Sequence, residues 1–391
     1  MPGRLFVTVA IGLITALLFI PVSVYAAVQS YGSAPHTEER TGQKDLRVLP
    51  FFAPTYSPEL GVVFNAGVLF SFKTNPEDPL LQCSSIPFAI GVSTTGSVRS
   101  SSLLTTFWLS DMIRFNANLW LKIMPDHYYG VGYEAGRYTE KGVETTAYDR
   151  FWWQINPRVY VRIYNHLFIG LNLDLNQTVA KNVSPGMASD PYYQKYGPDN
   201  YNGGAGLILM YDSRDVTVNA YSGIYLYGGA TFYGTYLGSD NTYQVFDFDY
   251  RQYQILGRPG QRIAWQLRSR TGVGGVPWAE MSQPGTPWDL RGYRWGRYRH
   301  NAMLFGIVEY RHQFRRRKNS PNAFGTQESR HGAAAWAGIG FIGADLAHLE
   351  HALPNVGVGY RFEIQPRMNL RVDIGFGIES IGFYIELNEA Y

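Results

Sequence analysis

The amino-acid sequence predicts an all-β protein that folds as a transmembrane antiparallel β-barrel. Apolar residues alternate with polar ones: from Leu167 to Leu175 every second residue is Leu or Ile, while Asn172 and Asp174 fall between them. A strand with two different faces requires this period of two. A soluble β-sandwich would alternate as well. Two further observations favour a barrel: the alternating segments are about ten residues long or longer, which suits membrane-crossing strands, and their polar faces repeatedly carry full charges, as a wet lumen allows.

The composition excludes several other classes. Of 391 residues, 45% are hydrophobic, 15% aromatic and only 17% charged, which argues against a disordered chain. Cys83 is the single cysteine, so a disulfide scaffold is excluded. A net charge of +3 over this length gives no support to nucleic-acid binding. Only the extreme N-terminus carries an apolar run long enough for a membrane helix, so a helical membrane protein is not expected.

Residues 1–26 read as a signal peptide. Arg4 precedes an apolar stretch that Pro21 interrupts, and Val24-Tyr25-Ala26 places small residues where a signal peptidase cuts. An uncleaved anchor is the alternative, because the apolar stretch is long. Residues 27–44 are small and polar and are expected to form a flexible periplasmic lead-in. The barrel would then occupy residues 45–391, in the outer membrane of a Gram-negative bacterium.

Fifteen strands follow from the alternation. Their expected ranges are 59–73, 85–97, 99–110, 112–124, 148–163, 166–178, 203–213, 222–236, 243–256, 260–273, 300–314, 332–343, 354–364, 367–377 and 380–391. Bacterial single-chain barrels have even strand numbers. We therefore expect a sixteenth strand at 45–53, where Pro50 is tolerable at an edge.

With the first strand starting in the periplasm, the long connections 125–147, 179–202 and 274–299 fall outside the cell. The Tyr-rich segment 190–202 suggests a sugar-binding site, but we interpret it as an ordinary wet outer loop. Aromatic residues near strand ends are expected to form girdles at the membrane interfaces. These are Trp108, Trp120, Phe151, Trp152, Trp153 and Tyr384.

The connection 274–299 contains Leu290-Arg291-Gly292-Tyr293. Here the chain resembles the BamA/TamA-type outer-membrane assembly superfamily, the bacterial surface antigen barrels. That family carries a hydrophobic-Arg-Gly-aromatic motif on the long sixth extracellular loop, which folds back into the lumen. The position between the eleventh and twelfth strands agrees, so the resemblance implies a sixteen-stranded barrel whose long extracellular loop enters the lumen.

Two further motifs carry the same resemblance, which spans residues 45–391. The first is the periplasmic turn motif, made by Asp212, Arg214, Asp215 and Gly223. This chain has Ala220 where the family usually has Pro. The second is the C-terminal strand, which resembles the signal read by the assembly machinery. It comprises Gly382, Phe383, Tyr384 and Tyr391, and we expect Phe383 and Tyr391 on its outward face.

An arginine drawn into a partly dry lumen needs a carboxylate partner, because burial removes its hydration. The resemblance implies an acidic partner on the following strands, yet Gly338 stands where that residue is expected. Glu309 is the better candidate. Its neighbours Val308 and Tyr310 belong to the apolar face of the strand, which is expected to meet lipid, so Glu309 is expected to point into the lumen. Asp373 is a second candidate. Gly292 would let the loop backbone pass close to the wall.

The resemblance implies assistance in the insertion or translocation of protein, or of lipid, at the outer membrane. Residues 27–44 are too few for the POTRA domains of assembly factors, so a barrel-only member is expected. Its first and last strands would form a weak seam. The alternative is a passive pore or structural surface antigen that retains the fold. Expected partners are outer-membrane lipid and lipopolysaccharide, unfolded barrel clients or periplasmic accessory proteins. No enzyme constellation, metal spacing or cofactor motif stands out.

Overall fold

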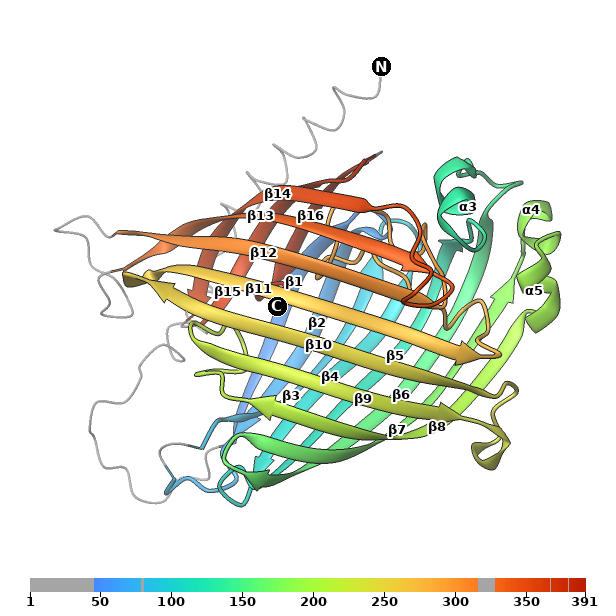
Figure 1. Ribbon diagram of the computed structural model, residues 1–391. Coiled ribbons are helices and arrows are strands. Elements are labelled where there is room, and N and C mark those ends of the chain that lie inside the picture. The colour runs from blue at the N-terminus through green and yellow to red at the C-terminus, as the bar shows by residue number, and fades with distance from the viewer. Residues whose placement is uncertain (1–45, 79–80, 316–327, 366, 379) are drawn as a thin grey trace.

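The computed structural model describes residues 46–78, 81–315, 328–365, 367–378 and 380–391. The predicted signal peptide and lead-in, and most of the basic run after Phe314, lie outside these residues. Sixteen antiparallel strands close into one barrel in which each strand pairs with its neighbours in sequence and β1 pairs with β16. Figure 1 shows the strands running obliquely around the wall, as closure of a barrel requires.

The first eight strands are β1 (Arg47–Ser57), β2 (Gly61–Phe72), β3 (Ser84–Ser93), β4 (Val98–Trp108), β5 (Ile113–His127), β6 (Ala147–Tyr164), β7 (Leu167–Lys181) and β8 (Asp199–Asp212). The other eight are β9 (Gly223–Tyr233), β10 (Tyr243–Leu256), β11 (Arg258–Gly274), β12 (Ala302–Arg315), β13 (Glu328–Gly343), β14 (Leu353–Gln365), β15 (Met368–Phe376) and β16 (Ile381–Leu387). The predicted strand order and count are confirmed. Most boundaries move by a few residues; at the two strands that close the barrel, β1 continues through Pro54 to Ser57, and β16 ends at Leu387 instead of 391.

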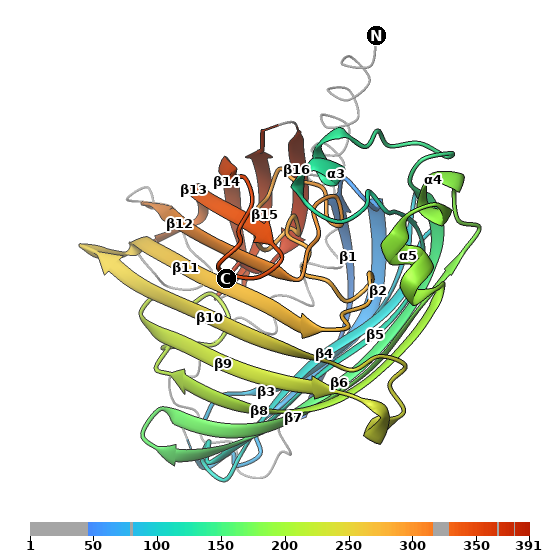
Figure 2. The same ribbon diagram turned by 45° about the vertical axis from the view of Figure 1, so that its right-hand side comes forward.

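The early end of β16 has a local cause. Asn388 adopts a left-handed backbone conformation with φ 66°, which turns the chain out of the strand. The last residues then run into the barrel, and the C-terminus lies within its outline in both views (Figures 1 and 2). The ring of Tyr391 is 6% exposed and lies over the Arg311 guanidinium at 5.3 Å. The prediction of Tyr391 on the outward face was therefore wrong.

The outer surface of the wall is apolar. On β7 the side chains of Ile169 and Leu171 are 48% and 63% exposed. Phe168, whose side chain lies on the opposite face of the same strand, is 1% exposed. The same alternation on β12 exposes Val308 and buries Glu309 completely. Exposed aliphatic residues on one face and buried polar residues on the other are what hydrocarbon outside a closed barrel requires.

The long connections gather at one end of the barrel. The segments 128–146, 182–198 and 275–301 join β5 to β6, β7 to β8 and β11 to β12. The first two carry the short helices α3 (Tyr133–Tyr138), α4 (Pro185–Ala188) and α5 (Pro191–Tyr196), which lie together at that end in Figure 1. Within the described residues, no helix is long and apolar enough to cross a membrane. That this end faces the cell exterior stays a prediction.

Candidate functional site

The segment 275–301, here called the long loop, presents its motif through a tight turn made by Asp289. The Asp289 carboxylate accepts hydrogen bonds from the backbone N–H groups of Gly285 at 2.8 Å and Thr286 at 2.7 Å. The Thr286 hydroxyl donates to the same carboxylate at 2.8 Å. Burial raises the pKa of Asp289, and the hydrogen bonds from Thr286 oppose that rise. The turn delivers Leu290 and Arg291, both fully buried, to the wall. Sequence reasoning missed Asp289, although its spacing from Thr286 is a common turn signal.

Arg291 meets both predicted carboxylates. Its Nη2 lies 2.5 Å from Glu309 Oε2 on β12, and its Nη1 lies 2.7 Å from Asp373 Oδ2 on β15. All three side chains are fully buried. The guanidinium carbon also lies 3.5 Å from the ring centroid of Trp336 on β13, a cation–π arrangement. One loop arginine therefore joins three strands of the wall.

The carboxylates are shared with further arginines of the wall. Arg311 Nε contacts Glu309 at 2.7 Å, and Arg371 Nη1 contacts Asp373 at 2.7 Å. Arg361 Nη1 contacts the other oxygen of Asp373, and its Nε contacts Glu389 at 2.9 Å. Sequence reasoning missed Arg361 and Arg371. The sequence does indicate that these two side chains point inward, because each alternates with apolar residues along its strand. No local pattern, however, indicates that β12, β14 and β15 share one network of charges.

Gly292 lies against the β15–β16 connection. Its φ of 117° is a conformation that L side chains rarely adopt, and an added Cβ would come within 2.8 Å of the Gly375 carbonyl carbon. A Cβ on Gly375 would lie 2.2 Å from the Arg291 carbonyl oxygen. The Gly292 N–H donates to the Tyr384 hydroxyl at 2.9 Å, and the Tyr293 hydroxyl donates to the Pro354 carbonyl at 2.7 Å. The close approach of backbones thus depends on glycine on both sides.

Two other side chains hold the loop backbone. Asn355 on β14 donates from Nδ2 to the Arg291 carbonyl oxygen, and its Oδ1 accepts from Trp336 Nε1 at 2.8 Å. The Trp295 N–H of the loop donates to Glu59 Oε1 at 3.2 Å, and Glu59 belongs to the β1–β2 turn. Burial raises the pKa of Glu59. Trp336 and Gly338 lie two residues apart on the same, inward-facing side of β13. The alternation that led to Gly338 as the expected acidic position could therefore also have identified Trp336.

The predicted aromatic girdle is only partly correct. Trp108 is 46% exposed on the outer surface. Tyr384 is fully buried because it faces the long loop. Trp152 lies against Lys122, with 4.5 Å between the ammonium and the ring centroid, and Trp120 flanks the same ammonium at 4.5 Å. These two tryptophans therefore surround an inward-facing cation instead of lying at the membrane interface.

The periplasmic turn motif forms a polar cluster at the opposite end of the barrel. Asp212 accepts from Arg214 Nε and from Arg114 Nη1, each at 2.8 Å. Asp215 contacts Arg367 Nη2 of the β14–β15 turn at 3.0 Å. Gly223 has φ 106°, and an added Cβ would lie 2.3 Å from the Ser213 carbonyl oxygen. The motif residues therefore close the β8–β9 turn and tie it to neighbouring connections.

The closure of the barrel is uneven. β1 pairs with β2 along its whole length, from Arg47 opposite Ser71 to Ser57 opposite Gly61. With β16, in contrast, its register is the single pair Tyr56 opposite Ile385. The ring of Phe383 lies 5.5 Å from that of Tyr56 across this joint. Figure 2 shows β16 standing beside β1 where the wall closes. We call this joint the seam.

Known structures share this architecture. The chain is similar to BamA from Haemophilus ducreyi, solved without POTRA domains 1–3, with a TM-score of 0.58 and 13% identity over 88% of this chain and 70% of that one. It is similar also to CdiB from Escherichia coli, with a TM-score of 0.54 and 8% identity over 88% of this chain and 67% of that one. No protein-family model matches the sequence, and no curated protein matches it. At these identities the likeness shows the fold.

Proposed function

We propose that this barrel lies in the outer membrane and assists the insertion or translocation of protein or lipid there, using the seam between β1 and β16 as the working edge. The observation that carries the proposal is the single registered pair between these strands. Unpaired N–H and C=O groups at a strand edge are a template for another strand. In hydrocarbon such groups must find partners, so a short closing ladder favours exchange with an incoming strand.

The long loop supports this proposal because it bridges both flanks of the seam. On one flank Gly292 contacts Tyr384 of β16, and on the other Trp295 contacts Glu59 beside β1. These contacts involve side chains of the buried face of the wall, which supports placing the loop inside the lumen. The loop would then act as a fastener whose release frees the seam. The apolar outer surface supports the proposed location in a membrane.

The seam can be tested by locking it. Tyr56→Cys and Ile385→Cys face each other across it, and Cys83→Ser removes the single native cysteine, which is exposed. The oxidised and reduced forms of this one triple variant provide a matched pair. Each is placed in liposomes, an unfolded small outer-membrane protein is added, and its folding rate is compared with empty liposomes and with an unrelated sixteen-stranded porin.

An insertase predicts that the reduced form accelerates client folding beyond both controls and that oxidation abolishes the acceleration. A second pair, Phe52→Cys with Ala66→Cys, lies opposite on the fully paired β1–β2 joint at two exposed positions, and crosslinking it in the same Cys83→Ser background should leave the rate unchanged. If the reduced form folds the client no faster than the porin does, the insertase proposal is wrong. Equal rates in the oxidised and reduced forms would exclude the seam as the working edge.

A passive pore is the second candidate. Charged side chains such as Asp249, Arg251 and Arg268 lie on β10 and β11, and a water-filled path would suit them. In planar bilayers a pore predicts steady conductance that rises when Arg291→Ala releases the long loop. Client folding without conductance would favour the insertase, and conductance without client folding would favour the pore.

A further inference from the structure

Residues 213–222, here called the crossing segment, join β8 to β9 at the short-turn end of the barrel. The Thr217 hydroxyl of this segment donates to Gln82 Oε1 of the β2–β3 connection at 3.3 Å. Asp215 Oδ2 of the same segment lies 3.0 Å from Arg367 Nη2 of the β14–β15 turn. One connection therefore touches two others at the same end of the barrel.

The two contacts lie far apart around the ring of strands. The six strands β3–β8 separate the crossing segment from the β2–β3 connection, and the six strands β9–β14 separate it from the β14–β15 turn. Connections beside one another at this end are separated by two strands. A segment that reaches both contacts must run across the opening of the barrel, so it lies over the short-turn mouth.

One side of the crossing segment is buried against the barrel interior. Asn219 and Ala220 are 5% and 2% exposed. Ala220 belongs to the buried apolar cluster that includes Ala264 of β11 and Tyr391. Val218, in contrast, is 44% exposed. The segment thus packs onto the lumen with one side and meets solvent with the other.

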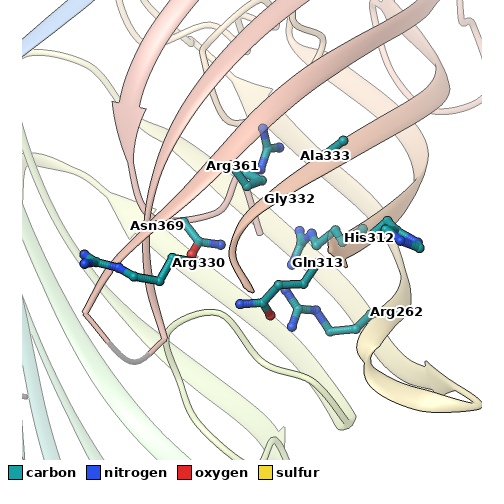
Figure 3. Close-up of a pocket in the computed structure, with 9 residues that line it drawn as sticks. Arg262, His312, Gln313, Arg330, Gly332, Ala333, Arg361 and Asn369 are labelled. Atoms are coloured by element: carbon teal, nitrogen blue, oxygen red, sulfur yellow. The ribbon is translucent and has the colours of Figure 1, made fainter. Parts of the chain in front are cut away.

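Tyr221 attaches the crossing segment to the wall. Its ring centroid lies 3.7 Å from the guanidinium carbon of Arg262 on β11 and 3.3 Å from that of Arg367, both cation–π arrangements. Figure 3 shows Arg262 beside Gln313 and Asn369, around a pocket whose enclosed space holds about one water molecule. On this side of the mouth the side chains therefore leave little room for a solute to pass.

The start of the crossing segment is held more firmly than its middle. Asp212, directly before it, contacts Arg114 and Arg214 at 2.8 Å each, and the Asp212 side chain is 3% exposed. The side chains of the Asp215–Arg367 pair are 28% and 31% exposed. Partly exposed ion pairs are weak and are screened by salt. The middle of the segment can therefore detach while its start stays in place.

From these contacts we infer that the crossing segment is a gate. It closes the short-turn mouth in this structure, and it opens when its middle separates from the β14–β15 turn and uncovers the lumen. Salt that screens the Asp215–Arg367 pair favours opening. The gate does not involve the seam, so its failure in a test would be distinct from a failure of the proposed insertase activity.

Opening can be measured with a cysteine on the buried side of the segment. Ala220→Cys in the Cys83→Ser background provides one thiol, and its labelling by a water-soluble maleimide is followed in the purified full barrel in a non-ionic detergent. We expect slow labelling, which Arg367→Gln accelerates about tenfold because an ion pair and a cation–π contact are lost. Tyr221→Leu should act in the same direction. Added salt should accelerate labelling before, but not after, Arg367→Gln.

Arg162→Gln is the matched control. Arg162 lies at the same end of the barrel, its side chain is 34% exposed, and it lies 4.0 Å from Asp111 of the β4–β5 turn. That contact joins neighbouring connections and does not cross the mouth, so its loss should leave the labelling rate unchanged. The heat-dependent gel mobility of each variant checks that it is folded.

A second measurement determines whether the movement opens the lumen. In planar bilayers, Arg367→Gln should raise the conductance of a barrel whose long loop Arg291→Ala has released, whereas Arg162→Gln should not. Gly375→Ala, which also displaces the long loop, provides the same background if Arg291→Ala does not fold.

Four results in folded barrels would overturn the gate. The first is fast labelling of Ala220→Cys in the otherwise native barrel. The second is a labelling rate that neither Arg367→Gln nor Tyr221→Leu changes. The third is an equal acceleration by Arg162→Gln. The fourth is faster labelling without a rise in conductance, because the segment would then move without closing the mouth.

Discussion

The two edges of strand β1 are joined to the wall in different ways. Toward β2 the backbone ladder runs the full length of the strand, whereas toward β16 one registered pair remains. Contacts of the long loop supplement the second joint: the Arg291 side chain joins β12 to β15, the Gly292 N–H donates to the Tyr384 hydroxyl of β16, and the Trp295 N–H donates to the Glu59 carboxylate of the β1–β2 turn. One edge is therefore closed by backbone hydrogen bonds, and the other depends on buried side chains that substitutions can remove one at a time.

The largest effect is expected for Arg291→Ala. Removing one partner leaves Glu309 and Asp373 buried with less positive charge, which typically costs about 3–5 kcal/mol. Urea unfolding followed by gel mobility in liposomes would measure the loss. Arg294→Ala, on the same loop but partly exposed, should cost far less. If the two variants unfold alike, closure does not depend on the buried ion pairs.

Gly375→Ala should come next. The added Cβ would lie 2.2 Å from the Arg291 carbonyl oxygen, so the long loop must move away from the wall. Overpacking of this kind costs about 1–3 kcal/mol. Gly228→Ala on β9 is the control, because a Cβ there meets nothing within 4 Å. Protease cleavage of the loop in folded barrels would detect its release, and equal protection of the two variants would contradict the close contact.

Tyr384→Phe removes a single hydroxyl. The buried Gly292 N–H would lose its acceptor, at a cost of about 1–2 kcal/mol. Tyr164→Phe, at a tyrosine that is 71% exposed, should be close to neutral. The midpoint of urea unfolding distinguishes the two. A neutral Tyr384→Phe would mean that the loop holds β16 through packing alone.

The smallest effect concerns pH at the β1 side of the seam. Burial raises the pKa of Glu59 above its ordinary value. The folded barrel therefore binds a proton at Glu59 more readily than the unfolded chain does, and this contribution to stability is present at low pH and lost as pH rises through the raised pKa. Relative to Glu59→Gln, the native protein should gain stability as pH falls from about 7 toward the ordinary carboxyl range near 4. A constant difference between the two proteins would exclude this titration.

Much of the wall was readable from the sequence because alternation is a local property. The phase of Val308 and Tyr310 put Glu309 inside, and the alternation at Leu167–Leu175 assigned both faces of β7. Alternation gave fifteen strands in the same way, and the even strand number of such barrels added the first strand, which Pro50 made hard to recognise. Proline is tolerated there because β1 forms little of a ladder on its β16 side.

What the sequence determined by itself was the period of two, the number and order of the strands, and the residues that carry the long-loop motif. Tertiary structure decided that both candidate carboxylates contact Arg291 at once and share Arg311, Arg361 and Arg371, and it decided where Tyr391 ends. These outcomes join residues such as Arg291 and Asp373 that lie far apart along the chain. Closure of the barrel brings them together, and the burial that results sets the strength of their contacts, so no local pattern could encode them.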